Sequence, residues 1–124
     1  MGRNVASAKT GPDYIDPAFH AAATGRPCLN LAPWAMRLDT LAQAAFSLAR
    51  EAEVVICEGV MGLFDGAFVG KGEPCGSTAD LSRATGWPVV LVIDAGAQAA
   101  SAAAVLKGFA TFEAGFEVLG VVFN

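Results

Sequence analysis

Apolar residues along the chain are concentrated in three short, uninterrupted runs. They span residues 54–57, 89–93 and 118–123, and valine, leucine and isoleucine supply most of their positions. Continuous apolar runs of this length are typical of strands buried on both faces, whereas a strand with one face in solvent alternates. The pattern therefore predicts three strands of a parallel sheet that are covered on both faces.

The segments between these runs have the periodicity of helices. Apolar residues recur every three or four positions in residues 38–52, which predicts an amphipathic helix. Residues 77–85 open with Ser77-x-x-Asp80, a capping-box pattern, and residues 98–112 form an alanine-rich third helix. The alternation of strands and helices predicts an α/β fold, with a parallel sheet, flanking helices and right-handed crossovers.

The first third of the chain has a different character. Residues 10–17 and 25–33 are rich in Gly, Pro, Asp and Asn and are predicted to be loops, with a short helix at 19–24 between them. Residues 59–76 form a second long, glycine-rich loop. Loops longer than about 12–15 residues in a compact domain are usually functional or disordered, so chemistry is expected in these segments.

Length and charge narrow the class of protein. The 124 residues suffice for one domain, expected to span 1–124, and 54% are hydrophobic while 16% are charged. The formal net charge is −4 and no basic cluster is visible, which argues against nucleic acid as a partner. No run of about 20 apolar residues and no leader-like N-terminus is present, so neither a membrane span nor a signal peptide is predicted.

The cysteines indicate a reducing compartment. There are three, at positions 28, 57 and 75, and no two form a C-x-x-C pair. An odd number of widely spaced cysteines indicates neither a disulfide framework nor a zinc site. The expected location is the cytoplasm.

Two acidic residues follow predicted strands. Glu58 comes directly after the first apolar run and before a glycine, and Asp94 comes directly after the second. Ligands of open α/β sheets bind outside the carboxyl ends of the strands, where a carboxylate can hold Mg²⁺ on nucleotide phosphates. A solvated strand end at Glu58, and capping of the next helix by Asp94, are the alternatives that position alone leaves open.

Further candidate residues lie in the loops. Asp13 and Asp16 stand three residues apart in the proline-flanked segment 11–17, which suits a rigid binding loop but is also common in turns. Asp65 precedes a glycine, an ordinary turn pair. His20, the only histidine, is expected to be packed or exposed rather than catalytic.

The chain resembles the cobyrinic acid a,c-diamide synthases, a dethiobiotin-synthetase-like branch of the P-loop ATPases. The resemblance lies in the stretches GPDYIDPAFHAAATGRPCLNL, EGVMGLFDGA, GSTADL, PVVLVIDA and GVVFN, in order, between Lys9 and Asn124. GPDYIDP and EGVMGLFDG together are specific to this family rather than generic nucleotide motifs. The resemblance implies glutamine-dependent, ATP-driven amidation of the a and c acetate groups of a corrin ring, through an acyl phosphate, in cobalamin biosynthesis.

The resemblance also implies roles for particular residues on the nucleotide. Asp13 and Glu58 match positions that organise Mg²⁺, and Lys9 matches a lysine near the phosphates of ATP. Asn124 matches the asparagine at which adenine recognition begins. Converging carboxylates repel each other unless a cation joins them, which agrees with a magnesium site.

A second set of residues is implied for the other substrate, a corrin-ring polycarboxylate. Tyr14, Asp16 and Asp65 match positions that hold this substrate or its intermediate, and they are the catalytic candidates. A glutaminase domain supplying ammonia is the implied partner.

The chain departs from the family pattern at both ends. Only MGRNVASA precedes Lys9, and it contains no G-x-x-x-x-G-K-[ST] phosphate loop. The first βα unit, the rest of the adenine site and the glutaminase domain are not matched, so a fragment truncated at both ends and inactive alone is expected. Ala32 stands where relatives usually have Asp.

Three alternatives remain open at this point. One is a synthase for another tetrapyrrole, such as nickel-sirohydrochlorin. Another is a ParA- or MinD-like ATPase switch on the same scaffold, against which GPDYIDP argues. The third is a gene remnant without function.

Overall fold

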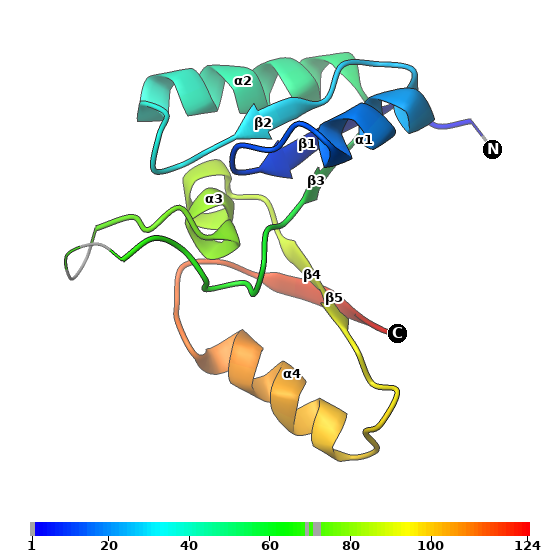
Figure 1. Ribbon diagram of the computed structural model, residues 1–124, viewed down its shortest axis with the longest axis vertical. Coiled ribbons are helices and arrows are strands. Elements are labelled where there is room, and N and C mark those ends of the chain that lie inside the picture. The colour runs from blue at the N-terminus through cyan, green and yellow to red at the C-terminus, as the bar shows by residue number, and fades with distance from the viewer. Residues whose placement is uncertain (1, 69, 71–72) are drawn as a thin grey trace. The chain divides into compact units, whose positions relative to one another are not determined.

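Strands and helices alternate along the whole chain. The computed structural model describes residues 2–68, 70 and 73–124, and within them five strands alternate with four helices (Figure 1). They are β1 (Val5–Thr10), α1 (Asp16–Thr24), β2 (Leu29–Leu31), α2 (Leu38–Glu51), β3 (Val54–Glu58), α3 (Thr78–Thr85), β4 (Val89–Ile93), α4 (Ser101–Thr111) and β5 (Val118–Phe123). The predicted strands at 54–57, 89–93 and 118–123 are confirmed, as are the four predicted helices, to within a few residues at their ends.

The chain divides into two compact units. One ends at Thr85 and the other spans Gly86–Asn124. The first unit contains a sheet in the order β2-β1-β3 and the second pairs β4 with β5, and every pairing is parallel. The predicted α/β class with parallel pairing is therefore confirmed.

Two strands were not predicted, and one of them is the centre of the first sheet. β1 lies in the segment before the first predicted loop, and β2 lies within the predicted loop at 25–33. The sequence of β1, VASAKT, has a single β-branched aliphatic residue, so its own propensity is weak. It forms a strand because it is hydrogen-bonded on both sides, to β2 and to β3.

The prediction that the apolar runs are strands buried on both faces was wrong for β3 and β4. Among the described residues, β3 pairs with β1 alone and β4 with β5 alone. Ile56 in β3 is 59% exposed, and Val90 and Val92 on one face of β4 are also exposed. The strand with the most complete burial is β1, in which Ala6 and Ala8 have almost no accessible surface.

The helices of the first unit cover both faces of its sheet. The connection through α1 leads from the central strand β1 to the edge strand β2. The connection through α2 then runs back past β1 to the other edge strand, β3. Because parallel crossovers are right-handed, α1 and α2 lie on opposite faces. α2 contacts all three strands and buries Leu41, Ala45 and Leu48, the amphipathic face that the sequence predicted.

The loop between β3 and α3 is tied to the helix that follows it. Of the predicted loop at 59–76, residues 69, 71 and 72 lie outside the described residues, and the remainder contains neither helix nor strand. The backbone N–H groups of Cys75, Gly76 and Ser77 all donate to Asp80 Oδ2, at 2.8, 3.0 and 3.3 Å. Ser77 Oγ accepts from the Asp80 N–H at 3.1 Å, so the predicted capping box is confirmed.

Gly76 is required at this point for two reasons. Its φ of +81° is in the left-handed region, and a Cβ there would lie 2.2 Å from Cδ1 of Trp34. The indole therefore packs directly on the backbone that leads into α3.

The second unit packs its two strands and one helix around a smaller core. Leu91 and Ile93 of β4 and Ala102 of α4 are buried. No helix in the described part of the chain is long and apolar enough to cross a membrane.

Asp80 is expected to make a measurable contribution to stability. Burial raises the pKa of its carboxyl, but the hydrogen bonds from Cys75, Ser77 and Gly76 lower it by more, so the net pKa is below the ordinary 3.8. Asp80→Ala leaves three backbone donors without their acceptor and should reduce the free energy of unfolding in urea at pH 7 by about 2 kcal/mol.

The pH dependence of this loss provides its control. A carboxyl with a lowered folded-state pKa stabilises the protein above its unfolded pKa and loses that effect as pH falls through the folded value. The difference between wild type and Asp80→Ala should therefore shrink below about pH 3.8. Asp39→Ala, in the first turn of α2 and exposed, should change stability much less; equal losses in both variants would contradict the assignment.

Candidate functional site

The carboxyl ends of β1 and β3 place two opposite charges next to each other. Lys9 is in register with Glu58, and paired residues of parallel strands project from the same face of the sheet. Both residues are the last or next-to-last of their strands. This is the edge at which α/β sheets bind ligands, as predicted for Glu58.

The Lys9 side chain is only 5% exposed and has a defined set of partners. Its Nζ donates to the Gly59 carbonyl oxygen at 2.7 Å. It lies 3.6 Å from Asp16 Oδ2 and 3.8 Å from Glu58 Oε1, which are ion-pair distances rather than close hydrogen bonds. The ammonium is thus neutralised by two carboxylates but firmly hydrogen-bonded to one carbonyl.

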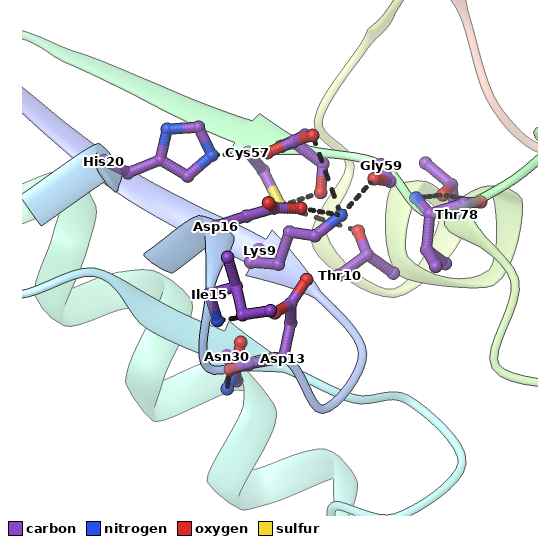
Figure 2. A network of polar contacts seen from close by, with 12 residues as sticks. Lys9, Thr10, Asp13, Ile15, Asp16, His20, Asn30, Cys57, Gly59 and Thr78 are labelled. Carbon is purple, nitrogen blue, oxygen red and sulfur yellow. Dashed lines mark hydrogen bonds and ion pairs between the residues drawn. The ribbon is translucent and has the colours of Figure 1, made fainter. Parts of the chain in front are cut away.

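Helix α1 completes this group from the side of the sheet that it covers. Asp16 and His20 are four residues apart, so they project from one face of the helix. Asp16 faces Lys9, and His20 Nε2 is hydrogen-bonded to Glu58 Oε2 (Figure 2). We call Lys9, Asp16, His20 and Glu58 the Lys9 cluster. In this cluster the Lys9 ammonium lies between the carboxylates of Asp16 and Glu58, and His20 contacts Glu58 from the other side.

Asp13 lies in the loop that leads from β1 to α1, beside the cluster (Figure 2). Its Oδ1 accepts from the Ile15 N–H at 2.8 Å, and its carbonyl oxygen accepts from Asn30 Nδ2 at 2.5 Å. The Ile15 hydrogen bond, with smaller effects of Asp16 and Lys9, holds the pKa of the Asp13 carboxyl below its ordinary value. Asp13 is therefore ionised at neutral pH.

The start of α3 supports the carbonyl to which Lys9 donates. Thr78 Oγ1 accepts from the Val60 N–H at 3.0 Å. A Cβ on Gly59 would lie 3.0 Å from the same Thr78 oxygen, so the threonine side chain packs against the backbone of this residue. Thr78 thus holds the Gly59–Val60 peptide, which carries the carbonyl that Lys9 binds.

Thr10 and Cys57 lie on the opposite face of the strand ends. Thr10 Oγ1 and Cys57 Sγ are 3.7 Å apart there, one residue beyond Lys9 and one before Glu58. Burial raises the pKa of the Cys57 thiol to about 11, against a smaller lowering by Thr10. Cys57 is thus a half-buried thiol whose surroundings disfavour the thiolate.

The structure joins some of the predicted site residues and leaves others apart. Lys9, Asp16 and Glu58 form one ion-paired group, with Asp13 nearby. Tyr14 is 86% exposed, and Asp65 is exposed with its Oδ2 accepting from the Gly62 N–H at 2.9 Å. The Asp65 N–H donates to the Gly62 carbonyl at 3.0 Å, so Asp65 closes a turn centred on Leu63 and Phe64, and the expected turn at the Asp65–Gly66 pair is not what forms.

Asn124 and Asp94 belong to the second unit. The Asn124 N–H donates to Ile93 and its carbonyl accepts from Ala95, so its backbone extends the pairing of β5 with β4. Asp94 Oδ1 accepts from the Gly96 N–H at 3.0 Å, in a turn that precedes α4 by several residues. Asp94 therefore does not cap that helix, which has no side-chain cap at its N-terminus.

His20 is the site residue that sequence reasoning missed. It was expected to be packed or exposed, and it contacts Glu58. The available signal was its spacing of four from Asp16 on a short helix that directly follows a strand and loop.

The donors of this site suit a hard cation that is shared with another ligand. Among the described residues, no three His, Cys, Asp or Glu side chains converge as a metal-binding group. Glu58 and Asp13 nevertheless offer carboxylate oxygens at the strand ends, and Mg²⁺ commonly takes one or two carboxylates plus phosphate oxygens and water. The residues present fit such a site.

Comparison with known proteins identifies close relatives over nearly the whole chain. It is 47% identical over 123 residues to the hydrogenobyrinate a,c-diamide synthase of Rhizobium meliloti, strain 1021, and 50% identical over 123 residues to that of Mesorhizobium japonicum. It is 47% identical over 124 residues to that of Brucella ovis. Each match covers 99% of this chain, and the chain spans about 28% of the length of these curated relatives.

The other comparisons returned no match. No family model and no solved structure matches the chain. The resemblance to a,c-diamide synthases, inferred from the sequence motifs, is confirmed by the named relatives.

The Cys57 thiol is expected to be slow to alkylate. With its pKa raised from 9.0 to about 11, its thiolate fraction at pH 8 should be about a hundredfold smaller than that of an ordinary thiol. Iodoacetamide labelling followed by peptide mass spectrometry should show slow modification of Cys57 in the folded chain and fast modification in guanidinium chloride. Equal rates in the two conditions would contradict the burial described here.

Proposed function

We propose that this chain is part of an ATP-dependent ligase that amidates the a and c acetate carboxylates of hydrogenobyrinic or cobyrinic acid. The observation that supports it best is the identity of 45–50% to hydrogenobyrinate a,c-diamide synthases over 99% of the chain. The reaction proceeds through an acyl phosphate, which ammonia from glutamine converts to the amide. The chain contributes the strand-end residues that hold the nucleotide and the corrin.

Lys9 is assigned to the phosphates of ATP. Its ammonium makes one close hydrogen bond, at 2.7 Å to Gly59, while both carboxylates stay beyond 3.5 Å. An ammonium has three donors, so it retains donors for an anionic oxygen. The buried stem of the side chain keeps the charge in place, which reduces the entropy lost on binding.

Glu58 and Asp13 are assigned to Mg²⁺. Bound magnesium would neutralise charge on the nucleotide phosphates. Both carboxylates already have an orienting partner, since His20 contacts Glu58 and the Ile15 N–H binds Asp13. Side chains held in this way position a cation more accurately than free ones.

The remaining candidates are assigned to the corrin and to adenine. Asp16 belongs to the Lys9 cluster, and the exposed Tyr14 lies in the loop just before it, where a large substrate has access. Asp65 is assigned to seating the corrin or its acyl phosphate, and Asn124 to adenine. Neither the nickel-sirohydrochlorin reaction nor a ParA- or MinD-like switch has a comparable observation in its favour.

The partners of the proposed reaction are small molecules and one further domain. The corrin polycarboxylate is the acceptor, and a glutaminase domain supplies ammonia. We place the reaction in the cytoplasm, without nucleic acid or membrane as a partner.

A segment exchange tests the proposed function. In the Rhizobium meliloti relative, the segment matched by this chain is replaced with this chain's own sequence, and the exchanged protein is assayed with hydrogenobyrinic acid, glutamine and Mg-ATP. Formation of the a,c-diamide, coupled to release of ADP, is the expected result. A folded exchange protein that binds the corrin but makes no amide would contradict the proposal.

Glu58→Gln in the exchange protein tests the magnesium assignment. Loss of one carboxylate charge should lower kcat by about a hundredfold or more, since metal positioning contributes several kcal/mol. Glu53→Gln is the matched control, because Glu53 directly precedes β3 at the opposite end of the strand, where its side chain accepts from the Asn4 N–H. Near-normal turnover in Glu58→Gln would make Glu58 a solvated strand end.

Asp65→Asn separates a substrate role from a metal role. If Asp65 seats the corrin, the change should slow amidation and alter the order of the two mono-amidated products while leaving Mg-ATP affinity nearly constant. Product distribution by chromatography and nucleotide affinity by calorimetry are the measurements. Wild-type product order with a large loss of Mg-ATP affinity would assign Asp65 to the metal instead.

A further inference from the structure

We propose that His20 is a positioning residue that holds the Glu58 carboxylate away from Lys9. By binding one carboxylate oxygen, it prevents Glu58 from closing onto the ammonium, so both groups remain available to a ligand at the strand ends. The inference deepens the proposed function and rests on it for the identity of that ligand. The geometry of the cluster, however, supports the positioning role by itself.

Glu58 has a different partner for each of its two carboxylate oxygens. Oε2 is hydrogen-bonded to His20 Nε2, and Oε1 faces Lys9 Nζ at 3.8 Å. A relaxed lysine–carboxylate pair closes to about 2.7–2.9 Å. The observed separation from Lys9 is therefore the arrangement expected when the carboxylate is held from the other side.

Hydrogen bonds at the end of α1 fix the position of His20. Thr24 Oγ1 donates to the His20 carbonyl at 2.9 Å, and the Gly25 N–H closes the helix on Ala21 at 2.9 Å. Arg26, directly beyond, bonds Asn4 and the Glu51 carbonyl at 2.7 and 2.6 Å. The end of α1 is thus fixed to the start of β1 and the end of α2, which prevents His20 from following Glu58.

The Lys9 ammonium cannot move away from Glu58. Its side chain is 95% buried and its Nζ is bound to Gly59. Without His20, the only mobile member of the pair is the Glu58 carboxylate, whose side chain is nearly half exposed. It would close onto the ammonium and take up a donor that the proposed nucleotide site uses.

A purely structural role for His20, packing α1 on the sheet, makes a different prediction. Packing would be lost equally in any substitution that removes the ring. A positioning role requires a donor at the place of Nε2, which glutamine supplies and asparagine, one methylene shorter, does not reach.

The test uses this chain with ¹⁵N-labelled lysine side chains, and follows the ammonium resonance of Lys9, assigned with Lys9→Arg. His20→Ala and His20→Asn should shift this resonance, and His20→Gln should return it to the wild-type position. In a Glu58→Gln background, His20→Ala should cause no further shift, because the carboxylate that moves is already absent. If His20→Ala does not fold, the contrast between His20→Gln and His20→Asn decides the test.

An unchanged Lys9 resonance in His20→Asn would overturn the proposal. It would also be overturned if the shift in the double variant equalled the sum of the shifts caused by His20→Ala and by Glu58→Gln alone. A second measurement uses the exchange protein, in which His20→Ala should lower kcat/KM for ATP about tenfold, mainly through KM, with His20→Gln within about twofold of wild type. An inactive exchange protein contradicts the proposed function alone, since the Lys9 resonance then still decides the role of His20.

Discussion

The buried charge of Lys9 is the constraint on which the site depends. An ammonium removed from water is costly unless it is paired and hydrogen-bonded, and this one lies at the end of the central strand of its sheet. Three segments meet its requirements: the loop after β3 supplies the Gly59 carbonyl, α1 supplies Asp16, and β3 supplies Glu58. The positions of these segments are therefore coupled, because moving any one of them exposes an unpaired buried charge.

The support for that charge extends well beyond the residues that touch it. The Gly59 carbonyl is positioned by Thr78, which is the first residue of α3, and α3 is capped by Asp80. Asp80 also occupies the backbone N–H groups at the start of α3, which would otherwise attract an anion. The helix terminus thus has a structural use here.

Much of the fold could be predicted from the sequence, because three strands have continuous apolar runs, the helix at 38–52 is amphipathic and the helix at 77–85 opens with a capping box. β1 could not, since Ala6, Ser7 and Ala8 have low strand propensity and are recruited by pairing on both sides. Glu58 was located by a local rule, that ligands bind at strand ends. Lys9 was identified only by resemblance, and the contact of His20 with Glu58 joins residues 38 positions apart, which no local pattern reports.

The single-sided pairing of β3 and β4 has a consequence for handling the chain. Each presents a row of backbone donors and acceptors that no described strand occupies, beside exposed aliphatic side chains such as Ile56 and Val92. Such an edge is a template for strand addition between molecules. Self-association by strand addition at such edges is favoured by high protein concentration and disfavoured by dilution or by charged residues introduced beside them.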